Sequence, residues 1–126
     1  MKDQLDLLLK IQKLEKFYHT HPPEAYSFVL RALDHTMKKL PKPRHISGQE
    51  LLEGIREYAL KEFGPMAGMV LKHWNIKNTL GFGQIVFDLI EVGLLRKREE
   101  DVLDDFKNGF DFKEAFKRKF EFGDSD

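Results

Sequence analysis

The sequence contains no cysteine, which excludes disulfides and thiolate chemistry and is typical of a protein from a reducing cytosol. It also lacks any apolar run of the roughly 18 residues that a membrane helix needs. The amino-terminal segment MKDQLDLLLKIQKLEK has only a short apolar stretch that charges follow at once, so it does not read as a secretion signal. We therefore expect a cytoplasmic protein that does not enter a membrane.

Net charge is absent as well, because 21 basic residues balance 21 acidic ones among 126 residues. A dedicated nucleic-acid binder usually carries a basic excess, so this balance counts against that class without excluding it. Apolar residues make up 41% of the chain, enough for one hydrophobic core. No repeat or low-complexity linker divides it, and we expect a single domain over residues 1–126 with a frayed tail at 123–126.

Apolar residues at helical spacing predict a first helix that ends near Tyr18 and a second that runs from Pro22 to Leu40. The third helix has the strongest start signal. Ser47 and Glu50 match a capping box, in which the side chain of each residue bonds to the backbone amide of the other.

Two shorter helices are predicted after the third. Gly64-Pro65 ends the third helix, and a helix at 65–73 follows it. After a turn, Thr79 is the predicted cap of a helix that extends to Val92. Gly93 then supplies a left-handed residue that closes this helix.

The helical period fades in the last quarter of the chain. Leu94 to Arg98 reads as extended, and Asn108-Gly109 is a dipeptide typical of hairpin turns. Asp111 then caps a last short helix through Phe120. The sequence therefore predicts a mainly α-helical, winged-helix-like domain with a small β-hairpin or wing and a carboxy-terminal helix.

Residues 45–74 read HISGQELLEGIREYALKEFGPMAGMVLKHW, and the segments EVGLL, DDF and FDF follow them. In these segments the chain resembles the planctomycete–verrucomicrobial conserved hypothetical family, which consists of small bacterial proteins of unknown function. The resemblance covers residues 17–116, and FGPMA, HW, EVGLL and DDF are its most distinctive pieces. It implies one compact bacterial domain and carries over no functional residues.

Nucleic-acid binding is one functional hypothesis. The helix at 65–73, a tight turn and the helix at 79–92 match a helix-turn-helix, whose second helix reads bases in the major groove. The residues on the face of that second helix away from its apolar stripe are Gly81, Gln84, Asp88 and Glu91. Two of them are acids, which repel phosphates, so the pattern disfavours specific DNA binding.

Weak nucleic-acid binding stays an alternative. The candidate contact residues are Lys77, Asn78, Gln84, Arg96, Lys97 and Arg98. Five acids between positions 99 and 105 follow the last three bases and can neutralise them. A second basic run, Lys38 to His45, holds four cations but is broken by two prolines and reads as a solvated loop. We expect any such binding to be salt dependent.

The segment His19-Thr20-His21, with Glu24 close behind, is the one plausible metal cluster. Alternate residues of an extended segment project the same way, so both imidazoles can meet one ion. Three ligands make an incomplete site, however, and the same residues also read as a helix start with Thr20 or His21 at the cap. We expect no catalytic residue, metal or cofactor, and a metal-dependent enzyme remains a further alternative.

Six of the eleven phenylalanines lie between Phe106 and Phe122. The last helix either docks on the domain's own core or leaves part of this cluster exposed to a protein partner or a second copy. The candidate interface residues are Phe110, Phe112, Phe116, Phe120 and Phe122. The leading hypothesis is a non-enzymatic protein-interaction or structural module.

Overall fold

The computed structural model describes residues 2–96, 106–107 and 109–116. These residues form helices and connecting turns, and no strand occurs among them. The helices are α1 (Lys2–Leu14), α2 (Pro23–Lys38), α3 (Gly48–Phe63), α4 (Ala67–His73), α5 (Thr79–Glu91) and α6 (Phe112–Ala115). Short 3-10 helices, η1 (Glu15–Phe17) and η2 (Gly64–Met66), follow α1 and α3. None of the helices in the described ranges has the length and apolarity to cross a bilayer.

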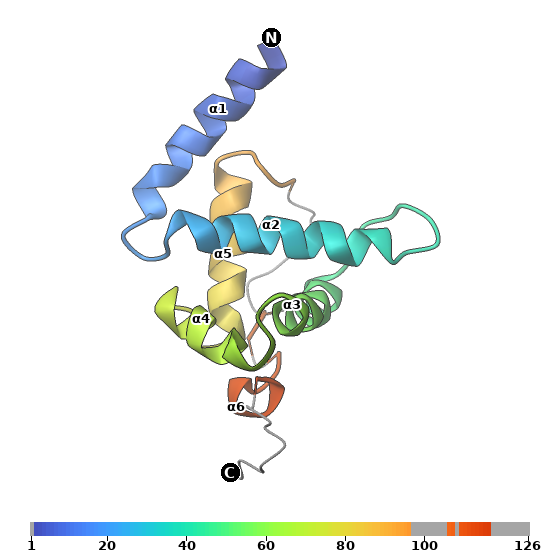
Figure 1. Cartoon of the computed structure of the whole chain (residues 1–126). Helices are drawn as coiled ribbons and strands as arrows, with labels where there is room; N and C mark the ends of the chain where they lie inside the picture. The colour runs from blue at the N-terminus through green and yellow to red at the C-terminus, as the bar shows by residue number, and fades with distance from the viewer. Residues whose placement is uncertain (1, 97–105, 108, 117–126) are drawn as a thin grey trace.

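Helix α5 occupies the centre of the molecule. In Figure 1 it runs behind α2, while α3 and α4 lie on the other side of α2 from α1. Phe82, Ile85 and Leu89 of α5 are completely buried, because α2 and α3 both pack against this helix. Helix α1 projects away from the other helices, and α6 lies at the opposite end of the molecule (Figure 1).

An aromatic cluster joins α2, α3 and the end of α4. The ring centroid of Phe28 lies 5.5 Å from those of Tyr58, Phe63 and Trp74, and Phe63 meets Trp74 edge to face at 5.7 Å. Such tilted and edge-to-face pairs are favoured geometries that add to the burial of apolar surface. These helices therefore form one continuous hydrophobic core.

Most helix boundaries follow the local signals. The capping box is confirmed, since Ser47 Oγ accepts from the Glu50 amide at 3.0 Å and Glu50 accepts from the Ser47 amide at 2.8 Å. Gly64 and Gly93 both have positive φ, at +53° and +88°, as expected for residues that end helices. The predicted cap of α5 was wrong: Asn78 is the cap, and its side chain accepts from the Gly81 amide.

Thr79 has a different role from the predicted one. It is buried as the first residue of α5, where its hydroxyl donates to the carbonyl of Phe106. The same oxygen accepts from the amide of Gly109 at 2.9 Å. Thr79 therefore attaches the carboxy-terminal segment to the start of α5, an interaction that only the tertiary structure reveals.

The predicted wing is not present in the described ranges. Leu94 to Arg96 continue as irregular chain after α5, where the amides of Leu94 and Leu95 both bond to the carbonyl of Leu89. Because these two amides complete the end of the helix, they are not free to pair with a neighbouring strand. The prediction of an extended strand from Leu94 was therefore wrong for the residues that the structure describes. Lys97 and Arg98, as well as Asn108 of the predicted turn, lie outside the described residues.

Candidate functional site

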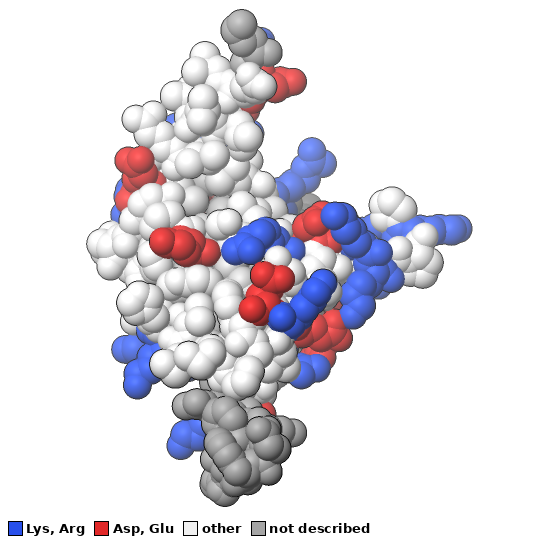
Figure 2. Space-filling view, viewed as in Figure 1, with Lys and Arg blue, Asp and Glu red and all other residues white. Residues whose placement is uncertain are grey.

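Helix α1 carries the largest group of exposed apolar side chains in the part of the chain that the structure describes. The group, here called the α1 leucine face, consists of Leu5, Leu7, Leu8, Leu9 and Ile11. Their exposed fractions range from 41% for Ile11 to 61% for Leu8. In Figure 2 the surface over α1 is mostly uncharged on the side that faces the viewer. Contiguous exposed apolar surface of this kind marks an interaction site.

The helix is attached to the rest of the protein through its carboxyl end. Leu14 is the buried residue of α1 and belongs to the hydrophobic core. Lys16, just after the helix, pairs with Glu91 of α5 at 3.2 Å. The Lys10 side chain lies against Gly93. These contacts hold the helix in place but leave most of its apolar side chains exposed.

A groove between α1 and α2 extends this surface. Ile11 belongs to both the groove and the α1 leucine face, and Tyr18, Leu30 and Leu94 make much of the remaining lining apolar. Arg31 lines the same groove and has an exposed side chain. A partner that covers the face can therefore extend onto α2 without meeting a buried charge.

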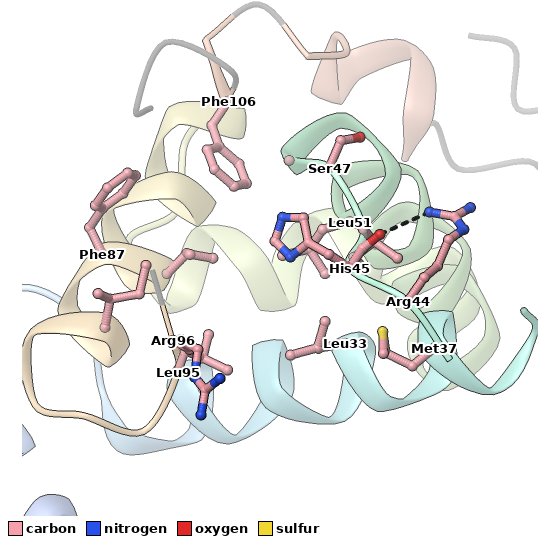
Figure 3. Close-up of a pocket in the computed structure, with 14 residues that line it drawn as sticks. Leu33, Met37, Arg44, His45, Ser47, Leu51, Phe87, Leu95, Arg96 and Phe106 are labelled. Atoms are coloured by element: carbon pink, nitrogen blue, oxygen red, sulfur yellow. Dashed lines mark hydrogen bonds between the residues drawn. The ribbon is translucent and has the colours of Figure 1, made fainter. Parts of the chain in front are cut away.

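A separate apolar cavity of about 200 Å³ lies among α2, the start of α3 and α5 (Figure 3). Its volume is below the roughly 300 Å³ at which small-molecule sites begin. Arg44 at its edge is engaged by Glu50, to which it donates at 2.8 and 3.1 Å. These bonds, with the Ser47 amide, lower the pKa of Glu50 to about 2. The cavity is thus a small apolar hollow beside an ion pair.

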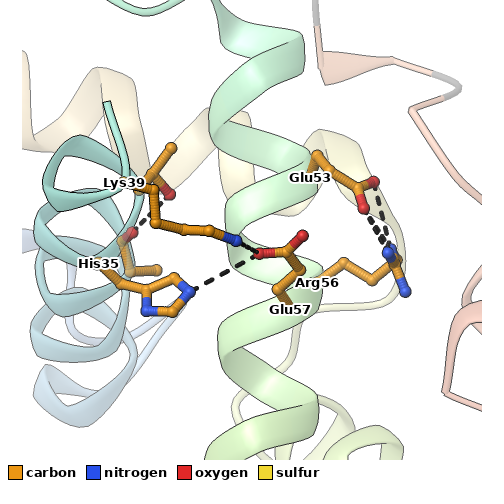
Figure 4. A network of polar contacts seen from close by, with 7 residues as sticks. His35, Lys39, Glu53, Arg56 and Glu57 are labelled. Carbon is orange, nitrogen blue, oxygen red and sulfur yellow. Dashed lines mark hydrogen bonds and ion pairs between the residues drawn. The ribbon is translucent and has the colours of Figure 1, made fainter. Parts of the chain in front are cut away.

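A polar network connects α2 to α3 (Figure 4). The Glu57 carboxylate of α3 accepts from Lys39 and lies 3.7 Å from His35 Nε2. Lys39 lowers the pKa of Glu57 through its hydrogen bond and its charge. Within α3, Arg56 pairs with Glu53. The contacts of Glu57 with Lys39 and His35 therefore tie α2 to α3, whereas the Arg56–Glu53 pair lies within α3.

Only some of the side chains predicted to contact nucleic acid are exposed and free of structural roles in the described residues. Lys77, Gln84 and Arg96 are exposed, whereas the Asn78 side chain is engaged as the cap of α5. Lys97 and Arg98 fall outside the described ranges. The exposed residues provide two cations and one amide, which is less than a phosphate-binding surface usually contains.

The basic run after α2 is largely neutralised. Its ion pairs are Lys38–Asp34, Lys39–Glu57 and Arg44–Glu50. Figure 2 shows the same arrangement, with acidic side chains among the basic ones at that end of α2. Cations paired in this way gain little by releasing counterions from DNA.

The face of α5 predicted to be open is partly covered. Gln84 and Glu91 are exposed, but Asp88 is half-buried against α2 and accepts from the Tyr26 hydroxyl at 2.7 Å. Burial raises the pKa of Asp88, although the hydrogen bond from Tyr26 opposes this effect. Part of the expected recognition surface is therefore a helix–helix contact, and this placement of Asp88 corrects the sequence-based prediction.

The His19-Thr20-His21 segment connects α1 to α2 and contacts the turn after α4. His21 is buried, and its Nδ1 lies 3.0 Å from the carbonyl oxygen of Trp74, which can only accept. Asn75 donates to the carbonyl of Thr20 at 3.0 Å. Pro22, rather than Thr20 or His21, is the cap residue of α2. Within the described ranges, no three histidine or carboxylate side chains gather to hold a metal ion.

The carboxy-terminal phenylalanines lie mainly against the protein's own core. Phe116 is buried, and Phe110 and Phe112 are partly buried around it at centroid distances of 5.7 and 5.2 Å. Phe112 also meets Phe82 of α5 at 5.8 Å. These three residues pack together beside α5, as the docking alternative expects, while Phe110 and Phe112 keep part of their surface exposed. Phe120 and Phe122 belong to the range that is not described.

The α1 leucine face does not follow from the sequence pattern, because the apolar stripe of the first helix is typical of a buried face. The helical spacing of Leu7, Leu8, Ile11, Leu14 and Tyr18 reads as a stripe that faces the core, whereas Leu5 and Leu9 lie outside it. The signal available in the sequence was the width of the apolar arc, which exceeds the single stripe that a helix needs to pack on the core.

In the described residues, helices are thus the only regular secondary structure, and the α1 leucine face stays exposed beside them. A comparison with protein-family models, curated proteins and solved structures finds no match to this chain. The resemblance to the bacterial family described above stays a prediction.

Proposed function

We propose that this protein is a non-enzymatic interaction module and that the α1 leucine face is its docking surface. The observation that supports this function is the exposure of five neighbouring leucine and isoleucine side chains on one helix. Moving one such half-exposed side chain out of water contributes roughly 1 kcal/mol, so a partner that covers all five gains substantial free energy.

The length of α1 supports the same function. The helix has 13 residues, and isolated helices of this length are marginal in water. Within the chain it gains packing mainly at Leu14 and at the contacts near its carboxyl end. A partner that covers the leucine face stabilises the helix as well as burying apolar surface.

For the scaffold, we propose a winged-helix-like arrangement. Helices α3, α4 and α5 follow one another in the order of a helix-turn-helix, with the turn at residues 74–78 between α4 and α5. Folds of this type serve several functions, so function must be inferred from the surface and not from the scaffold. The α1 leucine face lies outside the helices of the helix-turn-helix, so its exposure favours binding to a protein over binding to DNA.

The two alternatives have less support. Nucleic-acid binding has Lys77, Gln84 and Arg96 in its favour, but the neighbouring basic run is paired with acids. A metal-dependent enzyme has His19 and His21 in its favour, but no three histidine or carboxylate side chains of the described residues gather to hold a metal ion. Neither alternative uses the largest exposed apolar surface of the described residues.

Site-specific photocrosslinking in the source cells tests the proposed function. A photoreactive residue at Gln12, which is exposed on α1, should form protein adducts, while one at Lys61 on α3 should not. The adducts should disappear in the Leu5→Glu/Leu8→Glu variant, since two charges then stand in the apolar contact. A lack of adducts from Gln12, or adducts that persist in this variant, contradicts the proposal.

A further inference from the structure

We infer that the partner of the α1 leucine face is a second copy of this chain, whose α1 packs antiparallel to the first around a two-fold axis at Leu8. This inference rests on the proposed function and names the partner. Three features of α1 lead to it: the symmetry of its sequence about Leu8, the position of its charges and the size of its exposed surface.

The sequence of α1 is chemically symmetric about Leu8. Counting outward from it in both directions, the matching positions are Leu7 with Leu9, Leu5 with Ile11, and Gln4 with Gln12. In an antiparallel pair centred on Leu8, a two-fold axis brings each of these residues level with its match from the other copy. Apolar side chains then meet apolar ones and amides meet amides, as a self-complementary interface requires.

These matching residues also lie on one side of the helix. At 100° per residue, positions 4 to 12 that carry apolar or amide side chains fall in an arc of roughly 200° centred on Leu8. Leu8, at the centre of this arc, is 61% exposed and has the largest exposed fraction on the α1 leucine face. The charged side chains of Lys2, Asp6 and Lys13 project from the opposite side.

The order of charges along α1 selects the antiparallel orientation. Asp3 and Asp6 outnumber Lys2 in its amino-terminal half, whereas Lys10 and Lys13 lie in its carboxy-terminal half. Antiparallel packing places the acidic half of each helix beside the lysine half of the other and opposes the two helix dipoles. Parallel packing places like charges side by side. Because these charges lie away from the contact, they affect orientation more than affinity.

The exposed area is that of a small, reversible dimer interface. The five side chains of the face present roughly 450 Å² of apolar surface per copy, so a symmetric pair removes at most about 900 Å² from water. The buried area of the pair also includes Gln4, Gln12 and part of the groove lined by Tyr18 and Leu30. It therefore approaches the roughly 1,200 Å² of the smallest specific interfaces. We therefore expect a dimer that dissociates on dilution.

Neither an anionic membrane nor a nucleic acid matches α1 as well. Helices that lie on membranes carry an excess of lysine and arginine on the polar face. The polar face of α1 mixes Asp3 and Asp6 with Lys2, Lys10 and Lys13, an excess of a single lysine, and Asp6 pairs with Lys10 at 3.1 Å. This nearly balanced face suits a protein surface of the same composition.

Sedimentation equilibrium of the full chain tests the inference. Between about 1 and 200 µM, a range that suits an interface of this size, the mass should rise from one chain to two. Leu8→Glu should stay monomeric, because the two-fold axis brings both carboxylates together. An equimolar mixture of Leu8→Glu and Leu8→Lys should recover the dimer. Met69→Glu, at an exposed apolar position on α4, is the matched control and should dimerise like the parent.

Engineered cysteines test the orientation, since the chain has none of its own. Under mild oxidation, Leu8→Cys should form a disulfide-linked dimer, and a mixture of Gln4→Cys and Gln12→Cys should do the same. Gln4→Cys alone should not, because the two copies of position 4 lie about 12 Å apart along the pair, beyond the reach of a disulfide.

Several results overturn the inference: a parent protein that stays monomeric at about 200 µM, a Leu8→Glu variant that still dimerises, or rapid crosslinking of Gln4→Cys alone. Monomeric protein whose α1 binds phosphatidylglycerol vesicles also overturns it. If the chain is monomeric but Gln12 crosslinks to a different protein, the second-copy inference fails and the proposed function stands. If neither the dimer nor the adducts occur, both fail.

Discussion

Tyr26 and Asp88 form the closest polar contact between α2 and α5 that involves a buried side chain. The Tyr26 ring is almost fully buried, and its hydroxyl donates to the Asp88 carboxylate at 2.7 Å. Burial favours the neutral form of a carboxyl group, which is why the pKa of Asp88 is raised. The hydrogen bond compensates for part of the cost of burying the charged group but does not remove it.

At the residue scale we predict that Asp88→Asn stabilises the protein at neutral pH. With a raised pKa, folded Asp88 keeps its proton to a higher pH than the unfolded chain does, so its contribution to stability falls as pH rises through the folded pKa. An asparagine still accepts from Tyr26 and does not ionise. The difference in unfolding free energy between variant and parent should grow from pH 3 to pH 7 in urea titrations.

Asp34→Asn serves as the control for this series. Asp34 is exposed and pairs with Lys38 on the same helix, so its replacement should change stability by only a few tenths of a kcal/mol. A variant Asp88→Asn that is less stable than the parent at neutral pH contradicts the account of Asp88.

At the scale of elements, the contact between α2 and α3 depends on a glycine. A Cβ atom at Gly54 of α3 would lie 1.7 Å from the hydroxyl of Thr36 on α2, so only glycine allows this approach. The Thr36 hydroxyl donates to the Ala32 carbonyl within its own helix at 2.8 Å, which holds it in this orientation. The polar network of His35, Lys39 and Glu57 lies beside the same crossing (Figure 4).

We therefore expect Gly54→Ala to lower the free energy of unfolding by about 1–3 kcal/mol, although alanine is the better helix former. Chemical denaturation monitored by circular dichroism measures this change. Gly68→Ala in α4 is the matched control, because its Cβ meets Phe116 at an ordinary distance of 3.5 Å and should leave stability unchanged or slightly raised. Equal losses in both variants disprove the role of the close approach, while partial recovery in Gly54→Ala/Thr36→Ala supports it.

At the scale of the whole molecule, charge balance governs which partners are favourable. The 21 basic and 21 acidic residues cancel, and the basic run after α2 is tied to acids on α2 and α3. Long-range attraction to nucleic acid therefore has little net charge to act on. The proposed apolar contact through α1, in contrast, does not depend on net charge.

We predict that the protein does not bind duplex DNA at about 150 mM salt and that any binding at about 20 mM salt disappears with a steep salt dependence. Fluorescence anisotropy of a labelled duplex measures both conditions. Micromolar binding that persists at about 150 mM salt and is lost in Lys77→Ala/Arg96→Ala contradicts this prediction and supports the nucleic-acid alternative. Dimerisation through α1 should in contrast survive the higher salt concentration.

Local patterns predicted the helices better than the surfaces. The Ser47–Glu50 capping box and the glycines that end α3 and α5 act within a few residues, so the sequence contains all the information they need. The prediction of a wing was wrong for the described residues because the amides of Leu94 and Leu95 donate to the carbonyl of Leu89. The strand propensity of a segment does not indicate such helix-ending hydrogen bonds. The burial of Phe116 could not be predicted from local patterns. It depends on the contact of Phe112 with Phe82 of α5, which lies 30 positions earlier in the chain.

By itself, the sequence determined that the chain is mainly helical, where most helices begin and end, and that no cysteine chemistry is possible. Only the tertiary structure decided which helix faces are covered. Asp88 turned out to be half-buried because Tyr26, 62 positions earlier, packs over it, whereas Leu5, Leu8 and Leu9 remained exposed. Helical spacing shows that a face is apolar or polar, but whether another element covers it depends on contacts between residues far apart in the chain.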